Sequence, residues 1–298
     1  MKILITGGTG FIGRQLVALL STHHQITVLT RSPKRAADIL GSRPIFLISL
    51  DQLTDLNDFD LVINLAGEPI VQKRWTPEHK NILCHSRWDV TAKLSELFLK
   101  SSEPPSGFIS ASAVGYYGRQ NTISLSENAL PHQEFTHHLC HEWERQAFLA
   151  QNQNTRVCVI RIGVVLGANG GALEKMLPPF KYGLGGPISS GKQGMSWIHE
   201  RDLLRLIQYL MSHQDCQGVF NATAPNPVSN KEFSKALGSA LNRPAFIPMP
   251  AFVLKMLMGE MSDLFVEGQY VIPKKILEAN FEFNYPTLDN ALAQIIGK

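Results

Sequence analysis

Three glycines near the N-terminus have the spacing and the surroundings that dinucleotide binding requires. Gly7, Gly10 and Gly13 follow a short apolar stretch, residues 3–5, and precede a helical pattern of apolar residues. Glycines at such a turn let backbone N–H groups approach a pyrophosphate, and the start of the following helix adds a partial positive charge. The sequence therefore predicts that this turn binds a dinucleotide, with contacts from Gly7, Thr9, Gly10, Phe11, Ile12 and Gly13.

The second predicted strand, residues 26–30, indicates which dinucleotide is bound. A site that prefers NAD usually has Asp or Glu at the end of this strand, where it accepts hydrogen bonds from the ribose. Here Arg31 stands instead, and Ser32 and Pro33 are suited to begin a helix. A guanidinium beside a helix N-terminus can bind the additional phosphate of NADP. We therefore expect NADP(H) as the cofactor.

Further cofactor contacts are expected after the fourth and fifth strands, because doubly wound sheets bind ligands at the carboxyl ends of strands. Small residues follow the predicted strand 60–65 and allow a ribose or pyrophosphate to lie against the backbone. A salt bridge that holds the loop is an equal alternative for Glu68 and Arg87. The expected contacts are Leu65, Ala66, Gly67, Glu68, Arg87 and Ser110.

Hydroxyl groups follow the predicted strand 107–112, beside the expected nicotinamide position. Ser112, Tyr116 and Tyr117 are therefore the candidate catalytic residues. A serine bonded to backbone at the strand end is the alternative for Ser112. For the tyrosines, the alternative is that one packs under the cofactor and the other in the core.

Residues that flank the same strand ends are candidates for contacts with a substrate. His199 can exchange a proton near neutral pH, although a structural histidine is the simpler interpretation. His137 and His141 lie one helical turn apart, but no zinc-protease motif surrounds them and a polar helix face explains them, so we predict no metal site. The candidate substrate contacts are Arg74, Trp75, Arg161, Trp197 and His199.

The elements that must position these residues alternate between strands and helices. Such alternation predicts an α/β fold of the Rossmann type, a doubly wound parallel sheet with helices on both faces, and a smaller C-terminal α+β substrate lobe. We expect residues 1–162 to form the NADP-binding domain, with 195–222 returning to its sheet, and residues 163–194 and 223–298 to form the substrate lobe. The predicted strands are 2–6, 26–30, 45–48, 60–65, 107–112 and 156–161, and the clearest predicted helices are 76–100, 136–150 and 200–212.

The composition is that of a globular protein without an unusual partner. The 298 residues are 44% hydrophobic and 18% charged, with a net charge of +3, and no basic run suggests nucleic acid. The apolar runs are too short to span a membrane. Four cysteines lie far apart without a Cys-x-x-Cys pair, which is typical of reduced thiols in a cytoplasmic protein.

The motifs of the chain and their order resemble those of an extended short-chain dehydrogenase/reductase, the group that contains nucleotide-sugar epimerases and dehydratases. The chain most resembles the atypical YfcH-type proteins of the epimerase family. The resemblance implies a two-lobed enzyme, and relatives often form homodimers through two helices of the sheet layer. It is carried by residues 7–13, 64–69, 73–76, 86–87, 110–118, 143–144, 161–167, 185–188 and 196–199.

The resemblance also implies a catalytic Ser/Tyr/Lys set, in which tyrosine is the general acid/base and lysine lowers its pKa. Ser112 matches the serine, but Thr136 and Cys140 stand where tyrosine and lysine belong. The downstream pair Tyr270 and Lys274 has Pro273 inside it, which would disrupt the helix that must align the two groups.

Two functions remain open on the sequence. The first is an NADP(H)-dependent epimerase, dehydratase or reductase that transfers a hydride to or from a small polar or nucleotide-linked substrate. The second is an NADP(H)-binding regulatory or redox-sensing protein without turnover, which the missing tyrosine and lysine would explain.

Overall fold

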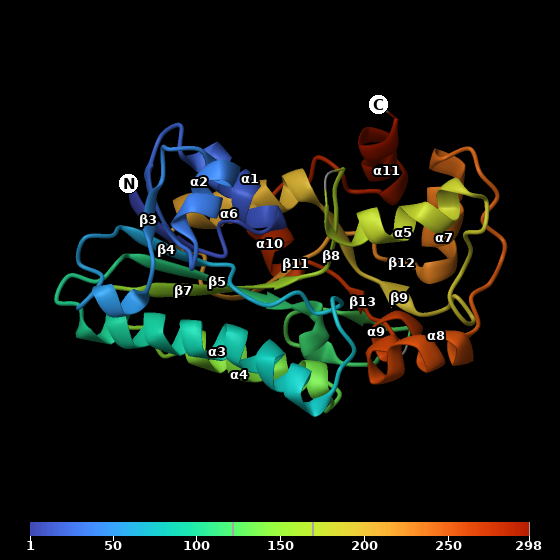
Figure 1. Cartoon of the computed structure of the whole chain (residues 1–298), viewed down its shortest axis with the longest axis horizontal. Coiled ribbons are helices and arrows are strands. Elements are labelled where there is room, and N and C mark those ends of the chain that lie inside the picture. The colour runs from blue at the N-terminus through green and yellow to red at the C-terminus, as the bar shows by residue number, and fades with distance from the viewer. Residues whose placement is uncertain (121, 169, 298) are drawn as a thin grey trace.

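A seven-stranded parallel sheet forms the larger part of the molecule (Figure 1). The computed structural model describes residues 1–120, 122–168 and 170–297. Every neighbouring pair of strands is parallel, and the chain runs outward in opposite directions from β1 and β4. The predicted doubly wound sheet is therefore confirmed, with its switch point between β1 and β4. In spatial order the strands are β11 (Gly218–Ala222), β7 (Arg156–Ile162), β5 (Gly107–Ala113), β4 (Leu61–Asn64), β1 (Lys2–Thr6), β2 (Gln25–Leu29) and β3 (Ile45–Leu47).

Helices cover both faces of this sheet (Figure 1). One face carries α1 (Phe11–Leu20), α2 (Pro33–Leu40) and α6 (Glu200–Ser212), and the other carries α3 (Pro77–Lys100) and α4 (Phe135–Phe148). Side chains of a strand alternate between faces, so Ile3 and Ile5 join the core under α1 and α6, whereas Leu4 joins the core under α3. Short 3-10 turns, η1 (Leu50–Gln52) and η2 (Val114–Tyr117), complete this domain.

Helix α3 shows how local sequence determines the length of an element. The Thr76 hydroxyl accepts a hydrogen bond from the backbone N–H of His79 at 3.2 Å, and Pro77 occupies the first helical position. The helix ends at Lys100, shortly before Pro104 and Pro105. Because start and stop signals are both local, the predicted bounds match the structure.

A smaller lobe with its own core lies at the other end of the molecule (Figure 1). Buried Leu173, Trp197, Phe233 and Leu292 meet in that core. Its strand pairs are β8 (Val164–Leu166) with β10 (Trp197–His199), β9 (Gly194–Met195) with β12 (Val228–Ser229), and β13 (Tyr270–Val271) with β6 (Ser124–Leu125). Its helical elements are α5 (Gly171–Lys181), α7 (Asn230–Ala240), α8 (Ala251–Met258), η3 (Gly259–Ser262), α9 (Asp263–Val266) and α11 (Leu288–Ile296). Helix α10 (Lys274–Glu278) instead packs against β11, and its Ile276 joins the core of the main domain.

One expected element lies elsewhere. The sequence predicts that residues 195–222 return to the main sheet; β11 does so, but β10, at the start of this segment, does not join the sheet. The backbone N–H of Gly163 still bonds the carbonyl of Ala222, whereas the next N–H, of Val164, bonds the carbonyl of Ser196 at 2.8 Å. The chain therefore leaves the sheet after Gly163, and β8 takes β10 as its partner.

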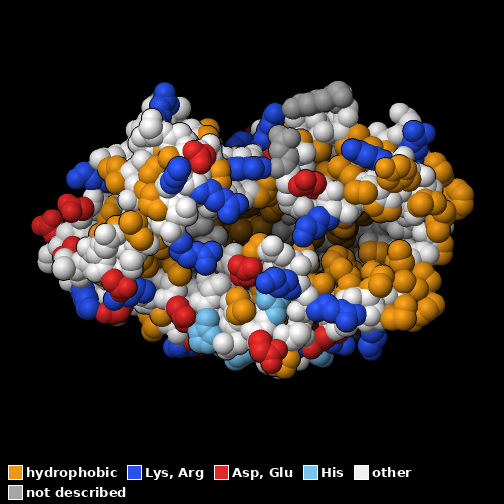
Figure 2. Space-filling view, in the orientation of Figure 1, with side chains coloured by type: hydrophobic (Ala, Val, Ile, Leu, Met, Phe, Trp, Pro, Cys, Tyr) orange, Lys and Arg blue, Asp and Glu red, His pale blue; other side chains and the backbone are white. Residues whose placement is uncertain are grey.

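Within the described part of the chain, no helix has both the length and the hydropathy that crossing a bilayer requires. Hydrophobic side chains gather on the smaller lobe in Figure 2. Phe252 of α8, a helix of this lobe, is 71% exposed.

The packing of α3 predicts the effect of one substitution. Leu94 is fully buried against the sheet, so Leu94→Ala should lower the free energy of unfolding by about 2–5 kcal/mol, measured by urea denaturation. Leu99 lies on the same helix but is 65% exposed, and Leu99→Ala should change stability by less than about 0.5 kcal/mol. Equal losses in the two variants would contradict the described orientation of α3.

Candidate active site

The glycine turn brings β1, α1 and the loop after β4 into close contact. Gly7 has a φ of +69°, and a Cβ at this residue would lie 2.4 Å from the carbonyl oxygen of Leu65. A Cβ at Gly13 would lie 2.1 Å from the carbonyl oxygen of Gly7. Gly10 precedes α1, and no side chain caps the helix there. The first N–H groups of α1 therefore remain available to a phosphate, as dinucleotide binding requires.

The end of β2 fits the additional phosphate of NADP. Arg31 is exposed directly after this strand, and no carboxylate occupies residues 30–32. Helix α2 begins at Pro33, and the Ser32 side chain makes no capping hydrogen bond to it. A cation and an uncapped helix N-terminus thus lie together, which is a suitable arrangement for a phosphate.

The loop after β4 is held by a buried arginine. The guanidinium of Arg87 donates hydrogen bonds to the carbonyl oxygens of Glu68 and Leu83, both at 2.8 Å. A Cβ at Gly67 would lie 2.9 Å from the Cζ atom of Arg87. Arg87 therefore positions the loop through the backbone of Glu68, whereas the alternative derived from the sequence was a salt bridge to its carboxylate.

Asn64 organises the end of β4 beside this loop. Its side-chain oxygen accepts a hydrogen bond from Thr6, and its amide donates to the hydroxyls of Thr91 and Ser110 at 2.8 and 3.2 Å. Ser110 is fully buried in this group, whereas Leu65 and Ala66 are half-buried beside the glycine turn.

A buried polar network lies behind the end of β5. The Glu144 carboxylate accepts hydrogen bonds from the Ser112 hydroxyl at 2.7 Å and from two nitrogens of Arg161, each at 2.8 Å. Arg161 also donates to the Tyr117 hydroxyl at 3.0 Å, and Tyr117 donates to Asn221 at 2.7 Å. Burial raises the pKa of Tyr117 above its ordinary value. Ser112, Tyr117 and Arg161 are thus all engaged with protein groups.

The remaining predicted catalytic residue, Tyr116, packs against the same network. The Cζ atom of Arg161 lies 3.3 Å from the centre of its ring, and the ring of His137 lies 4.9 Å away. Tyr116 is half-buried, and it does not reach the wall of the cavity described below.

A cavity of about 790 Å³ lies between the main domain and the smaller lobe. Figure 2 shows the surface hollowed between them. Of the residues that the sequence singled out, Phe11, Trp75 and Arg87 line this cavity. Thr136 and Cys140 line it too, because residues four apart share one face of helix α4. The two residues that replace the expected tyrosine and lysine therefore do face the cavity.

The predicted residues of β10 lie in the core of the smaller lobe. Trp197 and His199 are both fully buried. His199 accepts a hydrogen bond from the backbone N–H of Arg201 at 3.1 Å, contacts Gln294 at 2.8 Å and stacks on Tyr285. Burial lowers the pKa of His199, so the ring stays neutral near pH 7 and acts as the cap of α6.

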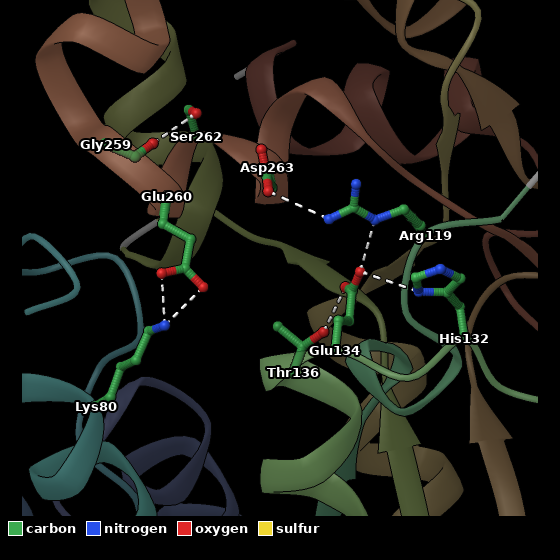
Figure 3. A network of polar contacts seen from close by, with 9 residues as sticks. All are labelled: Lys80, Arg119, His132, Glu134, Thr136, Gly259, Glu260, Ser262 and Asp263. Carbon is green, nitrogen blue, oxygen red and sulfur yellow. Dashed lines mark hydrogen bonds and ion pairs between the residues drawn. The ribbon is translucent and has the colours of Figure 1, made fainter. Parts of the chain in front are cut away.

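Ion pairs join the two lobes at the rim of the cavity (Figure 3). Lys80 of α3 pairs with Glu260 of η3 at 2.6 Å. Arg74 donates hydrogen bonds to the carbonyl oxygens of Met256 and Leu257 at the end of α8. Arg74 thus contacts the smaller lobe, and it does not line the cavity.

A polar group that the sequence did not single out faces the cavity (Figure 3). Glu134, just before α4, accepts hydrogen bonds from Arg119 at 2.9 Å and from the Thr136 hydroxyl at 2.8 Å. Burial opposes the ionisation of Glu134, but these hydrogen bonds outweigh it and hold its pKa below the ordinary value. Arg119 also lies 3.4 Å from Asp263 of the smaller lobe. The sequence could have indicated Glu134 only through its position, two residues before Thr136, which stands where the catalytic tyrosine is expected.

Cys140 lies next to this group but remains a thiol. The residue is 2% exposed, and burial raises the pKa of the thiol to about 12. A protonated thiol is a weak nucleophile and a poor general base at neutral pH, so Cys140 contributes shape to the cavity wall and no charge.

A doubly wound sheet, a glycine turn at its switch point and a cavity against a smaller lobe together define an extended short-chain dehydrogenase/reductase. The chain belongs to the NAD dependent epimerase/dehydratase family, whose model matches residues 3–223. A second model, a domain of unknown function designated DUF1731, matches residues 249–295.

Similar proteins occur in bacteria, plants and animals. The chain is 42% identical to an SDR39U1 homologue from Arabidopsis thaliana, described as chloroplastic, over 99% of this chain and 87% of that protein. It is 36% identical to the epimerase family protein YfhF from Bacillus subtilis, over 99% of this chain and 98% of that protein. The crystal structure of human SDR39U1 with NADPH has a TM-score of 0.91 and 36% identity, and the match covers both chains completely.

The buried network predicts a large difference between two neighbouring glutamates. Glu144→Gln should lower the free energy of unfolding by about 3–5 kcal/mol, because it leaves the buried Arg161 charge without its counter-charge. Glu142 pairs with Arg145, which is half exposed, so Glu142→Gln should cost less than about 1 kcal/mol. Urea denaturation measures both, and equal small losses would show that the buried pair contributes little.

Proposed function

We propose that the protein is an NADP(H)-dependent enzyme that transfers a hydride to or from a carbonyl carbon in the cavity between its lobes. The observation that carries this proposal is the pair of uncapped helix starts, at α1 beside the glycine turn and at α2 beside Arg31. The NADPH in the crystal structure of human SDR39U1 supports the same choice of cofactor.

Two groups of residues would hold the cofactor. The glycine turn and the first N–H groups of α1 suit the pyrophosphate, and Arg31 with the start of α2 suits the additional phosphate. Phe11 and Arg87 line the cavity where the nicotinamide would lie. When bound, NADPH supplies a hydride to a carbonyl carbon while the oxygen takes up a proton, and NADP⁺ accepts a hydride from an alcohol in the reverse direction.

Thr136 and Glu134 are the groups placed to move that proton. The Thr136 hydroxyl donates to the Glu134 carboxylate and faces the cavity, so its oxygen can accept a hydrogen bond from an alcohol. Because its pKa is held low, Glu134 is ionised near neutral pH and can take the proton that passes through Thr136 when an alcohol is oxidised. When a carbonyl is reduced, the proton would come from solvent to Glu134 and pass through Thr136 to the substrate oxygen in the opposite direction. This pair replaces the tyrosine and lysine of the usual mechanism.

The network below the cavity has a positioning role in this proposal. The hydroxyls of Ser112 and Tyr117 donate hydrogen bonds to Glu144 and Asn221, and Arg161 neutralises the charge of Glu144. These residues hold β5, β7 and α4 in register. Trp75 is the predicted substrate contact that remains on the cavity wall.

One observation favours a second function. The absence of tyrosine and lysine from α4, together with the engaged hydroxyls of Ser112 and Tyr117, is also compatible with an NADP(H)-binding regulatory or redox-sensing protein. Such a protein would bind NADPH tightly and show no turnover.

The cofactor assignment predicts a preference that depends on Arg31. We expect NADPH to bind at least tenfold more tightly than NADH, about 1.4 kcal/mol, and Arg31→Ala to remove this preference. Arg35 lies on α2 and is exposed, so Arg35→Ala is the matched control and should keep it. Titration followed by tryptophan fluorescence measures both, and equal binding of NADPH and NADH by the unaltered protein would refute the assignment.

The proton pathway predicts a loss of turnover without loss of cofactor binding. In a screen of NADPH oxidation with aldehydes and ketones, Thr136→Ala and Glu134→Gln should lower kcat about 100-fold, because proton transfer loses its partners. The NADPH affinity should stay unchanged, and Thr136→Ser should recover turnover relative to Thr136→Ala. Full activity of both variants would exclude the pathway, and inactivity of the unaltered protein across the screen would favour the regulatory function.

A further inference from the structure

The wall of the cavity is mainly apolar. Aromatic and aliphatic side chains come from both lobes and surround most of the space, among them Trp75, Phe135, Met176, Met195, Leu264 and Phe265. The smaller lobe contributes four of these six. A wall of this kind favours a ligand that buries apolar surface.

The cations at the cavity are mostly occupied by protein groups. Among the described residues, Arg87, Arg119 and Lys175 are the cationic side chains of the wall. Arg87 donates to backbone carbonyls, and Arg119 is held between Glu134 and Asp263, as Figure 3 shows. Of these three described cations, Lys175 of α5 is the one left for a ligand.

Carboxylates outnumber these cations. Five of them belong to the described wall: Glu134, Glu174, Glu260, Asp263 and Glu267. The N-terminus of α5 also reaches the cavity, but Glu174 already lies in its first turn. Lys80 pairs with Glu260 from outside the described wall, and with this cation included the carboxylates exceed the cations by one. A diphosphate would therefore bring two negative charges to a wall that is already slightly negative, whereas diphosphate sites supply arginines and free helix starts.

Two buried polar atoms offer single, uncharged hydrogen bonds instead. Trp143 and Gln193 both line the cavity. Within the described part of the chain, the indole N–H of Trp143 and the side-chain oxygen of Gln193 are buried without a hydrogen-bond partner. The Trp143 N–H can donate to a carbonyl or hydroxyl oxygen, and the Gln193 oxygen can accept from a hydroxyl group, since an unpaired buried polar atom costs free energy until a ligand satisfies it.

We infer that the substrate is an uncharged, largely apolar carbonyl compound or the corresponding alcohol, and that the cavity excludes nucleoside diphosphate sugars. This inference rests on the proposed function, because it names the substrate class of the same site. It differs from the small polar or nucleotide-linked substrate that the sequence suggested.

The test uses prodan, an uncharged naphthyl ketone whose fluorescence shifts to shorter wavelength in apolar surroundings. With NADP⁺ present, prodan should bind saturably to the full-length protein with this shift, and millimolar UDP-glucose should not displace it. Phe265→Ala should weaken prodan binding about tenfold. Phe252→Ala removes an exposed phenylalanine that does not line the cavity, and it should leave binding unchanged.

Three results would overturn the inference. These are the absence of prodan binding, equal binding by the two phenylalanine variants when both are folded by circular dichroism, and displacement of prodan by millimolar UDP-glucose. The NADPH titration separates this inference from the proposed function. If prodan binds but NADPH does not, the cofactor assignment is refuted and the apolar substrate class stands. If NADPH binds and UDP-glucose displaces prodan, the substrate class is refuted and the cofactor assignment stands.

Discussion

The buried ion pair between Glu144 and Arg161 joins helix α4 to strand β7 beneath the cavity. Burying two charges costs several kcal/mol for each ion unless the geometry is good and the remaining lone pairs are bonded. Here Arg161 uses two nitrogens on the carboxylate, and the Ser112 and Tyr117 hydroxyls complete the network. Glu144 lies four and eight residues after Cys140 and Thr136, so fixing it fixes the face of α4 that meets the cavity.

This arrangement separates two tasks that one residue set usually combines. The residues under the cavity hold the sheet and α4 in register, and their protons are committed to protein acceptors. In the proposed mechanism the exchangeable proton moves through Thr136 and Glu134 at the start of α4, where the hydrogen bond from Arg119 helps to hold the pKa of the carboxyl group low. Lys80 and Arg119 at the rim are already paired with Glu260 and Asp263 of the smaller lobe. These ion pairs join the two lobes, and they leave little positive charge to bind an anionic substrate.

The parts of the fold that could be predicted are those with local signals. The glycine turn and the bounds of α3 follow from neighbouring residues, because turn and capping preferences act over a few positions. The partner of β10 could not be predicted, since the alternation of strands and helices does not say where the chain leaves a sheet. A structural role for His199 was the simpler interpretation of the sequence, but its partners Gln294 and Tyr285 could not be predicted because they lie far along the chain.

By itself, then, the sequence determined the Rossmann architecture, the position of the glycine turn and the arginine that suits NADP, because each depends on residue type at short range. Only the tertiary structure decided what faces the cavity. The hydroxyls of Ser112 and Tyr117 could in principle exchange a proton with a substrate, yet they donate hydrogen bonds to Glu144 and Asn221, which lie far away in the sequence. The cavity wall, with Glu134, Arg119 and the apolar side chains, forms only where segments far apart in the sequence meet. Burial and pairing depend on that packing, so the sequence could not show which residues line the cavity.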